Sequence, residues 1–89
     1  MYQLDISAQV HRFIEHLPPK HAGQIARKLV ALQIDPYPQD CKRLHGSPFS
    51  RVDSGEYRII FMVIGKKIRV PLIGKRNDSD VYRRLDRLQ

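Results

Sequence analysis

Two arginines and a tyrosine in the second half of the chain have the residue types and the spacing that phosphate chemistry needs. Arg58 lies in an apolar stretch between Tyr57 and Ile59, Arg76 follows a second apolar stretch, and Tyr82 comes six residues later. Arginine offers a planar set of donors that matches phosphate oxygens, and it stays charged at any relevant pH. Tyrosine can stack on an unpaired base or hydrogen-bond near a phosphate. This set of side chains suits the cleavage of RNA.

RNA can be cleaved by its own 2′-hydroxyl group without a metal ion. The reaction needs a group that takes the 2′ proton, positive charge beside the pentacovalent phosphorane, and help for the departing 5′ oxygen. The alternative is structural: Arg58 can pair with Asp53 or Glu56 across a turn, while Arg76 and Tyr82 can be a solvated turn and a core tyrosine. The sequence leaves both interpretations open.

The histidines and the cysteine do not form a second candidate site. His11, His16 and His21 are five residues apart, which is about 500° of helix rotation and places consecutive members on different faces. No carboxylate joins them at the spacing of metal ligands. Cys41 is the single cysteine, and His45 follows it in an expected loop without a third group to orient it. We therefore expect neither a metal ion nor a cofactor.

Composition and charge narrow the class of protein. A chain of 89 residues suffices for one domain, 1–89, and leaves little room for a large cavity, so an active site should be an open groove. Sixteen Lys and Arg against nine Asp and Glu give a net charge of +7. Residues 51–89 hold ten of the bases and five of the acids, a net of +5, whereas residues 1–50 hold six and four, a net of +2. This excess indicates a polyanionic partner.

No segment indicates a membrane span or an export signal. The longest apolar run is the six residues from Ile59 to Ile64, whereas a span needs about 20. The first residues lack a basic start followed by an apolar stretch. We expect a soluble, cytoplasmic protein without a membrane partner.

Apolar periodicity predicts a strand and two helices in the first half. Residues 2–6 alternate as a strand, and Ser7 can cap a helix whose apolar stripe ends at Leu17. Pro18 and Pro19 should stop this helix. A second helix is expected from about Lys20 to Leu32. Its buried face should consist of Ala22, Ile25, Ala26, Leu29 and Leu32.

The period changes to two in the second half. A loop is expected over 35–48, strands over 49–52, 57–64 and 68–73, and a last helix after a cap at Asp78 or Ser79. Turns are expected at Asp53-Ser54-Gly55 and at Gly65-Lys66, and Gly74 should end the last strand. The last helix should contain Val81, Tyr82, Leu85 and Leu88.

These elements predict a small single α+β domain. It should have an N-terminal strand, a helical hairpin, a three-stranded antiparallel meander that completes a roughly four-stranded sheet, and a short C-terminal helix. Pro71 interrupts the last strand, and proline cannot donate to a strand ladder. We therefore expect an edge position, a bulge or an outward-facing nitrogen at Pro71.

Two stretches resemble a known toxin family. KRLHGSPFSRVDSGEYRIIF at 42–61, followed by IGKRNDSDVYRRL at 73–85, resembles the RelE-like branch of the RelE/ParE superfamily of bacterial toxins. Length, charge and element order agree over essentially the whole chain. The resemblance implies the toxin of a type II toxin–antitoxin system, an endonuclease that cuts mRNA in the ribosomal A site and so inhibits translation. Its partners would be the translating ribosome, mRNA and a cognate antitoxin.

The resemblance also implies roles for single residues. Arg58 would stabilise charge on the scissile phosphate, Arg76 would protonate or stabilise the leaving oxygen, and Tyr82 would orient the mRNA or stack on it. Arg51 falls where the family commonly places a basic residue. Two residues later the family often has a lysine as candidate general base. This chain has Asp53 there, so the proton acceptor is Asp53, Glu56 or neither. RNA contacts are expected from Lys42, Arg43 and Lys75.

Two other functions stay open beside the nuclease. A ParE-like toxin inhibits DNA gyrase by binding, but such proteins typically lack the set of Arg51, Arg58, Arg76 and Tyr82. A basic nucleic-acid-binding module without chemistry would lose only modest, salt-dependent affinity when Arg76 is replaced. In either toxin, an acidic, partly disordered antitoxin segment would be expected to cover the basic surface.

Overall fold

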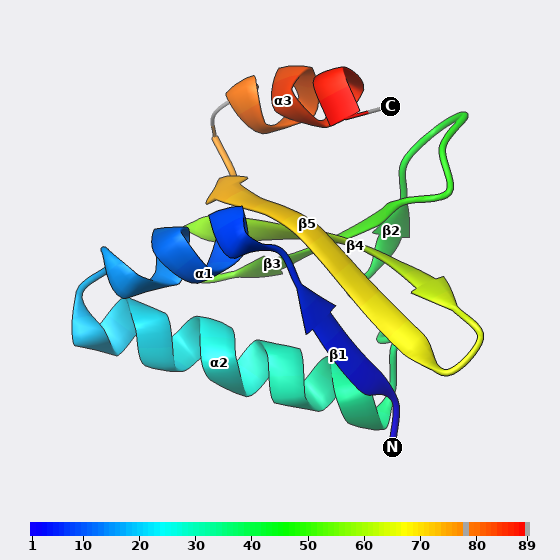
Figure 1. Cartoon of the computed structure of the whole chain (residues 1–89), viewed down its shortest axis with the longest axis horizontal. Coiled ribbons are helices and arrows are strands. Elements are labelled where there is room, and N and C mark those ends of the chain that lie inside the picture. Colours follow the sequence, from blue (N-terminus) through cyan, green and yellow to red (C-terminus); the bar gives the residue numbers. More distant parts are fainter. Residues whose placement is uncertain (78, 89) are drawn as a thin grey trace.

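A computed structural model describes residues 1–77 and 79–88, which form one five-stranded sheet with helices on both faces (Figure 1). The strands are β1 (Gln3–Ile6), β2 (Lys42–Arg43), β3 (Ser50–Ser54), β4 (Tyr57–Ile64) and β5 (Lys67–Lys75). Their order is β1-β5-β4-β3-β2; β1 runs parallel to β5, and the other neighbours are antiparallel. The α+β class is confirmed. The expectation of four strands is corrected by β2, which lies inside the expected loop.

Two helices, α1 (Ala8–Glu15) and α2 (Pro19–Ile34), cover one face of the sheet (Figure 1). Ser7 caps α1 as expected, because its Oγ accepts the N–H of Val10 at 3.1 Å. The helix ends before Leu17, since a residue that precedes proline disfavours the helical conformation. Pro19 then starts α2, where its missing N–H costs no hydrogen bond.

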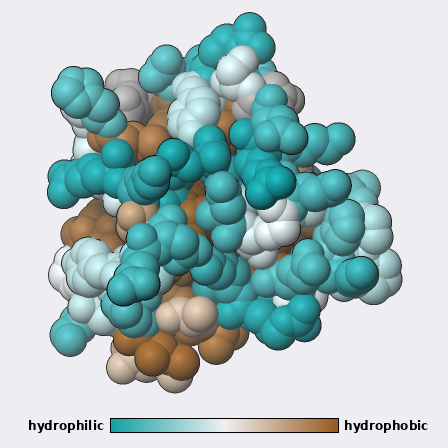
Figure 2. Space-filling view, turned by 180° about the vertical axis from the view of Figure 1, so that it is seen from behind, coloured by the Kyte–Doolittle hydropathy of each residue, from teal (hydrophilic) through white to brown (hydrophobic). Residues whose placement is uncertain are grey.

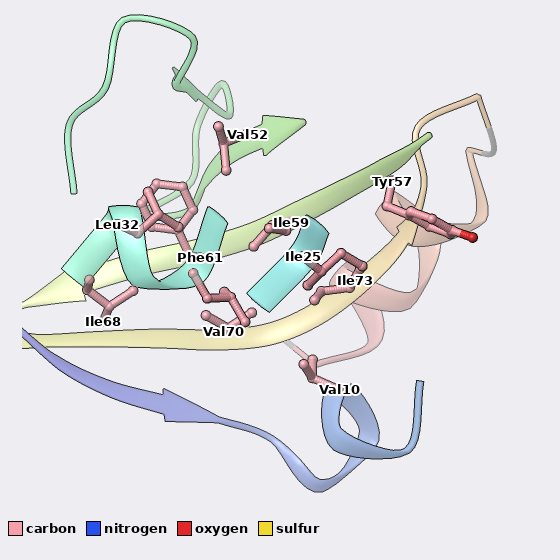
Figure 3. Close-up of a cluster of buried hydrophobic side chains, with 11 residues drawn as sticks. Val10, Ile25, Leu32, Val52, Tyr57, Ile59, Phe61, Ile68, Val70 and Ile73 are labelled. Carbon is pink, nitrogen blue, oxygen red and sulfur yellow. The ribbon is translucent and has the colours of Figure 1, made fainter. Parts of the chain in front are cut away.

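The main core lies between this helix pair and the sheet (Figure 3). Ile25, Leu29 and Leu32 of α2 are buried there, as expected. Ala26 was expected on the same face but is exposed. It follows Ile25 by about 100° of helix rotation, which carries it out of the stripe that the three larger residues define. The core side chains that Figure 3 labels come from both helices and from β3, β4 and β5.

A second, smaller core lies on the opposite face of the sheet, under α3 (Asp80–Leu88). It consists of Phe49, Ile60, Leu72, Val81 and Leu85. α3 packs closely because residue 74 is glycine: a Cβ there would lie 3.2 Å from the Cβ of Val81. The expected cap Asp78 and the side chain of Leu88 lie outside the described residues, whereas Ser79 directly precedes the helix, and its carbonyl accepts the N–H of Tyr82 at 3.1 Å.

Pro71 lies in a β-bulge, which was one of its expected placements. Ile60 pairs with Leu72 and Met62 pairs with Arg69, so two residues of β5 lie opposite one residue of β4. The bulge reverses the alternation of β5: Val70 faces the main core, and Leu72 faces the second core. Gly74 was expected to end the strand, but β5 continues through Lys75. The bulge therefore places Gly74 on the face that α3 covers.

Candidate active site

The first hairpin places Asp53 and Arg58 directly opposite each other. Both are strand residues, Asp53 of β3 and Arg58 of β4, and they are partners in the antiparallel register. The turn consists of Gly55 and Glu56 alone, with Gly55 at φ 59°, a conformation that favours glycine. The expectation that Asp53 and Ser54 belong to the turn is therefore wrong, because strand pairing continues through Ser54.

Arg58 binds Asp53 and Tyr82 at the same time. Its Nε donates to Oδ1 of Asp53 at 2.8 Å, and its Nη2 donates to Oδ2 at 3.3 Å. Its Nη1 donates to the hydroxyl oxygen of Tyr82 on α3 at 2.5 Å. We call Asp53, Arg58 and Tyr82 the Arg58 cluster. The cluster confirms the structural pairing of Arg58 with Asp53 that the sequence had left open.

The cluster is partly open to solvent, and at neutral pH it contains a charged pair, Asp53 and Arg58. The side chain of Arg58 is 15% exposed and that of Asp53 is 35% exposed. The hydrogen bond from Arg58 lowers the pKa of Asp53, with smaller contributions from the charges of Arg51 and Arg76. The hydrogen bond to Asp53 likewise raises the pKa of Arg58. The positive charge of Arg76 thus reaches the cluster, although Arg76 lies in the turn after β5.

Other expected residues share this face of the sheet. Arg51 lies two residues from Asp53 on β3, so alternation gives both side chains the same face. Lys42 of β2 lies directly opposite Arg51 and therefore shares that face as well. The backbone N–H of Arg76 donates to the carbonyl of Glu56 at 3.0 Å, which ties the end of β5 to the first hairpin turn. The structure thus gathers basic residues from three separate segments.

Two expected RNA-binding residues lie elsewhere. Arg43 adjoins Lys42 and so points to the opposite face, and its Nε donates to the carbonyl of Ser47 at 3.2 Å. Lys75 lies opposite Tyr57, whose ring is buried in the main core. The register places Lys75 on that face too. RNA contacts of Arg43 and Lys75 stay predictions.

A groove adjoins the Arg58 cluster, with Tyr82 in its wall. It has a volume of about 340 Å³ and is lined by Leu44, His45, Gly46, Ser47, Tyr82, Leu85 and Asp86. An open groove beside an aromatic ring is the setting in which an unpaired base can stack. In the sequence, His45 was set aside together with Cys41, because both fall in an expected loop without a third group to orient them. Only the fold shows that His45 borders the groove beside Tyr82, while Cys41 packs against the main core.

Within residues 1–77 and 79–88, no group of three or more His, Cys, Asp or Glu side chains could hold a metal ion. His21 is half-buried, and its Nδ1 lies 2.8 Å from the hydroxyl of Tyr57.

Over residues 1–77 and 79–88, no helix combines the length and the apolar character that a bilayer span requires. The space-filling view from behind is mostly hydrophilic (Figure 2).

Comparison with solved structures identifies the fold. The chain is 26% identical to RelE in the archaeal RelE–RelB complex from Pyrococcus horikoshii, with a TM-score of 0.76 over 84% of this chain and 94% of that one. It is 26% identical to a mutant of the E. coli toxin RelE in the free state, with a TM-score of 0.78 over 99% and 98%. The intact E. coli RelBE toxin–antitoxin complex gives 25% identity and a TM-score of 0.73 over 84% and 96%.

No family model matches the chain, and no curated protein matches it in sequence. The likeness therefore rests on the fold, at low sequence identity, together with the two motifs at 42–61 and 73–85. These motifs contribute β3, β4 and α3, the elements that carry the Arg58 cluster. The resemblance of this chain to the RelE-like toxins is confirmed, and it has their fold.

Proposed function

We propose that this protein is the toxin of a type II toxin–antitoxin system and cleaves mRNA in the A site of the translating ribosome. The observation that carries the proposal is the Arg58 cluster. Arg58 and Tyr82 come from separate motifs and meet at 2.5 Å on a face that also bears Arg51. Overlap with RelE toxins along nearly the whole chain supports the same function.

The proposed reaction is an attack by the 2′ oxygen of RNA on the adjacent phosphorus. A bond forms between these two atoms, the bond from phosphorus to the 5′ oxygen breaks, and the products end in a 2′,3′-cyclic phosphate and a 5′-hydroxyl. Arg58 stabilises the negative charge of the phosphorane. Arg76 stabilises or protonates the 5′ oxygen, and Tyr82 orients the RNA or stacks on it. The 2′ proton passes to an acceptor, for which Asp53 and Glu56 are the acidic candidates in the sequence.

The ribosome supplies positioning in this account. When the reacting groups are held in the right mutual orientation, the activation barrier falls, by about 7–11 kcal/mol in well-oriented intramolecular reactions. An 89-residue chain with an open groove holds a flexible mRNA poorly by itself. A ribosome that presents the codon to Arg58 and Tyr82 removes this difficulty. Because its substrate is mRNA on a translating ribosome, the protein acts in the cytoplasm.

A cognate antitoxin is the second proposed partner. Several of the similar structures are RelE–RelB complexes. The net charge of +7 favours an acidic partner segment. Large apolar side chains are also exposed, among them Val30, Ile34, Tyr37 and Ile64. Of these, Tyr37 and Ile64 line the same groove, in which the apolar side chains of a protein segment can pack.

The test is to map the 5′ ends of a translated mRNA in a cell-free system. We expect cuts at codon-phased positions that require ribosomes. Arg58→Ala should lower the cleavage rate about 10²–10³-fold, as the loss of one oxyanion-stabilising group does elsewhere. Arg12→Ala removes the same charge from α1, on the opposite face, and should leave cleavage unchanged. Intact mRNA with the wild-type protein would contradict the proposal, and a gyrase supercoiling assay would then test the ParE-like alternative.

A further inference from the structure

The geometry of the Arg58 cluster points to a role for Asp53 that its position in the sequence does not reveal. We propose that Asp53 is a positioning residue that fixes the guanidinium group of Arg58 for phosphate binding, and that it is not the proton acceptor of the reaction. The proposal rests on the proposed function, since it concerns the same site. It removes Asp53 from the two acidic candidates for the proton acceptor and leaves Glu56.

The ion pair fixes the plane of the guanidinium group. Nε and Nη2 of Arg58 bind separate carboxylate oxygens of Asp53, at 2.8 and 3.3 Å. A two-point contact of this kind sets orientation as well as distance. The two residues face each other across a ladder of paired strands, so their backbones hold the pair in register. Tyr82 adds a third contact from α3, at Nη1.

The clamp leaves part of Arg58 available to a substrate. Arginine has five N–H donors. Three are used in the cluster, one each on Nε, Nη1 and Nη2. One N–H on Nη1 and one on Nη2 are left. These two donors can bind phosphate oxygens while Asp53 and Tyr82 hold the group still. A side chain fixed before the substrate arrives loses less conformational entropy on binding.

The same contacts make Asp53 a poor proton acceptor. Both of its oxygens already accept hydrogen bonds from a charged guanidinium group, and protonation of the carboxylate would remove the negative charge that strengthens these bonds. The positive charges of Arg51, Arg58 and Arg76 act on its carboxylate, with Tyr82 beyond Arg58, and the negative charge of Asp40 opposes them. All three arginines favour the carboxylate over the protonated acid. They lower the pKa of Asp53, whereas an efficient base has a pKa near the working pH.

The clamp can be tested on the free protein. Nitrogen-detected NMR follows the exchange of the Nε proton of each arginine with water. We expect exchange at Arg58 to be slower than at an exposed arginine by about tenfold or more, because the proton is held by a charged acceptor. Asp53→Asn should remove most of this protection. Asp5→Asn is the matched control, since Asp5 pairs with Arg69 across β1 and β5 at 3.5 Å, outside the cluster.

The role in catalysis is tested by single-turnover cleavage of mRNA on ribosomes. Asp53→Asn should lower the saturated rate only about tenfold and leave ribosome affinity unchanged, because asparagine keeps one acceptor for Arg58. Loss of a general base typically costs about 10²–10⁴-fold. In an Arg58→Ala background the same change should have no further effect, since no guanidinium group is left to position. If Asp53 were a base that acts independently of Arg58, its replacement would lower the rate further in that background.

The outcomes separate this proposal from the proposed function. An unprotected Nε proton at Arg58, or equal exchange in wild type and Asp53→Asn, would overturn the clamp. A loss of more than about 100-fold that persists in the Arg58→Ala background would restore Asp53 as the base. A wild-type protein that protects the Arg58 proton and yet leaves mRNA intact would keep the clamp and reject the nuclease.

Discussion

The chemistry of the site depends on how one guanidinium group divides its donors between protein and substrate. Residue type alone predicted that Arg58, Arg76 and Tyr82 suit phosphate chemistry. The residue types could not show that Asp53 binds Arg58, because this pairing depends on strand register and on a turn only two residues long. The position of His45 beside Tyr82 was equally hidden, since it arises from the packing of α3 against a distant loop.

At the residue scale, Asp53 should make stability depend on pH in the acid range. Its pKa is lowered in the folded protein, so its stabilising effect is complete above its unfolded pKa of about 3.9 and is lost as the pH falls through the folded value. Asp53→Asn should therefore lower the free energy of unfolding by about 1 kcal/mol at pH 7, a magnitude limited by solvent screening. The difference should shrink as the pH falls below about 3.9 and vanish once the pH is below the folded value. Urea denaturation across this range measures it, and a difference independent of pH would exclude the ion pair.

Tyr82→Phe separates the hydroxyl group of Tyr82 from its ring. The variant keeps the aromatic surface for stacking but removes the acceptor of the Nη1 hydrogen bond. We expect the cleavage rate to fall about tenfold, which corresponds to one hydrogen bond to a charged group. Tyr37→Phe, an exposed position on the loop after α2, should have no effect. Equal rates in wild type and Tyr82→Phe would show that the ring alone matters.

At the scale of elements, long periodic segments were predicted well. Tyr57–Ile64 was predicted as a strand with its observed bounds, because its alternation and its flanking turns agree. The two-residue strand β2 was missed, since two residues show no period and form a strand only by pairing with β3. The structural effect of Pro71 could not be predicted from the sequence either. A bulge was one of three options, and the sequence did not show that it turns Gly74 toward α3.

Replacement of glycine by alanine should have opposite effects on stability at Gly74, in the contact between β5 and α3, and at Gly23, in α2. Gly74→Ala should destabilise the protein by about 1 kcal/mol, because the new Cβ would lie 3.2 Å from Val81 and push α3 outward. Cleavage should fall too, since α3 carries Tyr82. Gly23→Ala, inside α2, meets Arg27 at an ordinary 3.4 Å and should stabilise by about 0.5–1 kcal/mol. Thermal unfolding measures both, and equal shifts at the two sites would contradict the close packing of α3.

At the scale of the whole molecule, different basic residues belong to the two faces of the sheet, so their contributions to RNA binding can be separated. Lys42 and Arg51 lie on the face of the Arg58 cluster, whereas Arg12 lies on α1, which packs against the opposite face. Binding of a single-stranded RNA should weaken with salt by about 0.7 logarithmic units per phosphate contact. Lys42→Ala and Arg51→Ala should each reduce this slope by about that amount, and Arg12→Ala should not. Identical slopes in all three variants would mean that RNA does not use this face.

RNA cleavage by 2′-hydroxyl attack at the Arg58 cluster requires the 2′-hydroxyl group beside the scissile phosphate, so the decisive substrate is a ribosome-bound mRNA that lacks this single group. The deoxy substitution is placed at the nucleotide before the mapped cut, and an unmodified mRNA runs beside it. We expect the unmodified mRNA to yield a 2′,3′-cyclic phosphate and a 5′-hydroxyl end, and the substituted mRNA to stay whole at that position. Cleavage of the substituted mRNA at the same position and rate would contradict the mechanism, and an unmodified mRNA left intact would contradict the function.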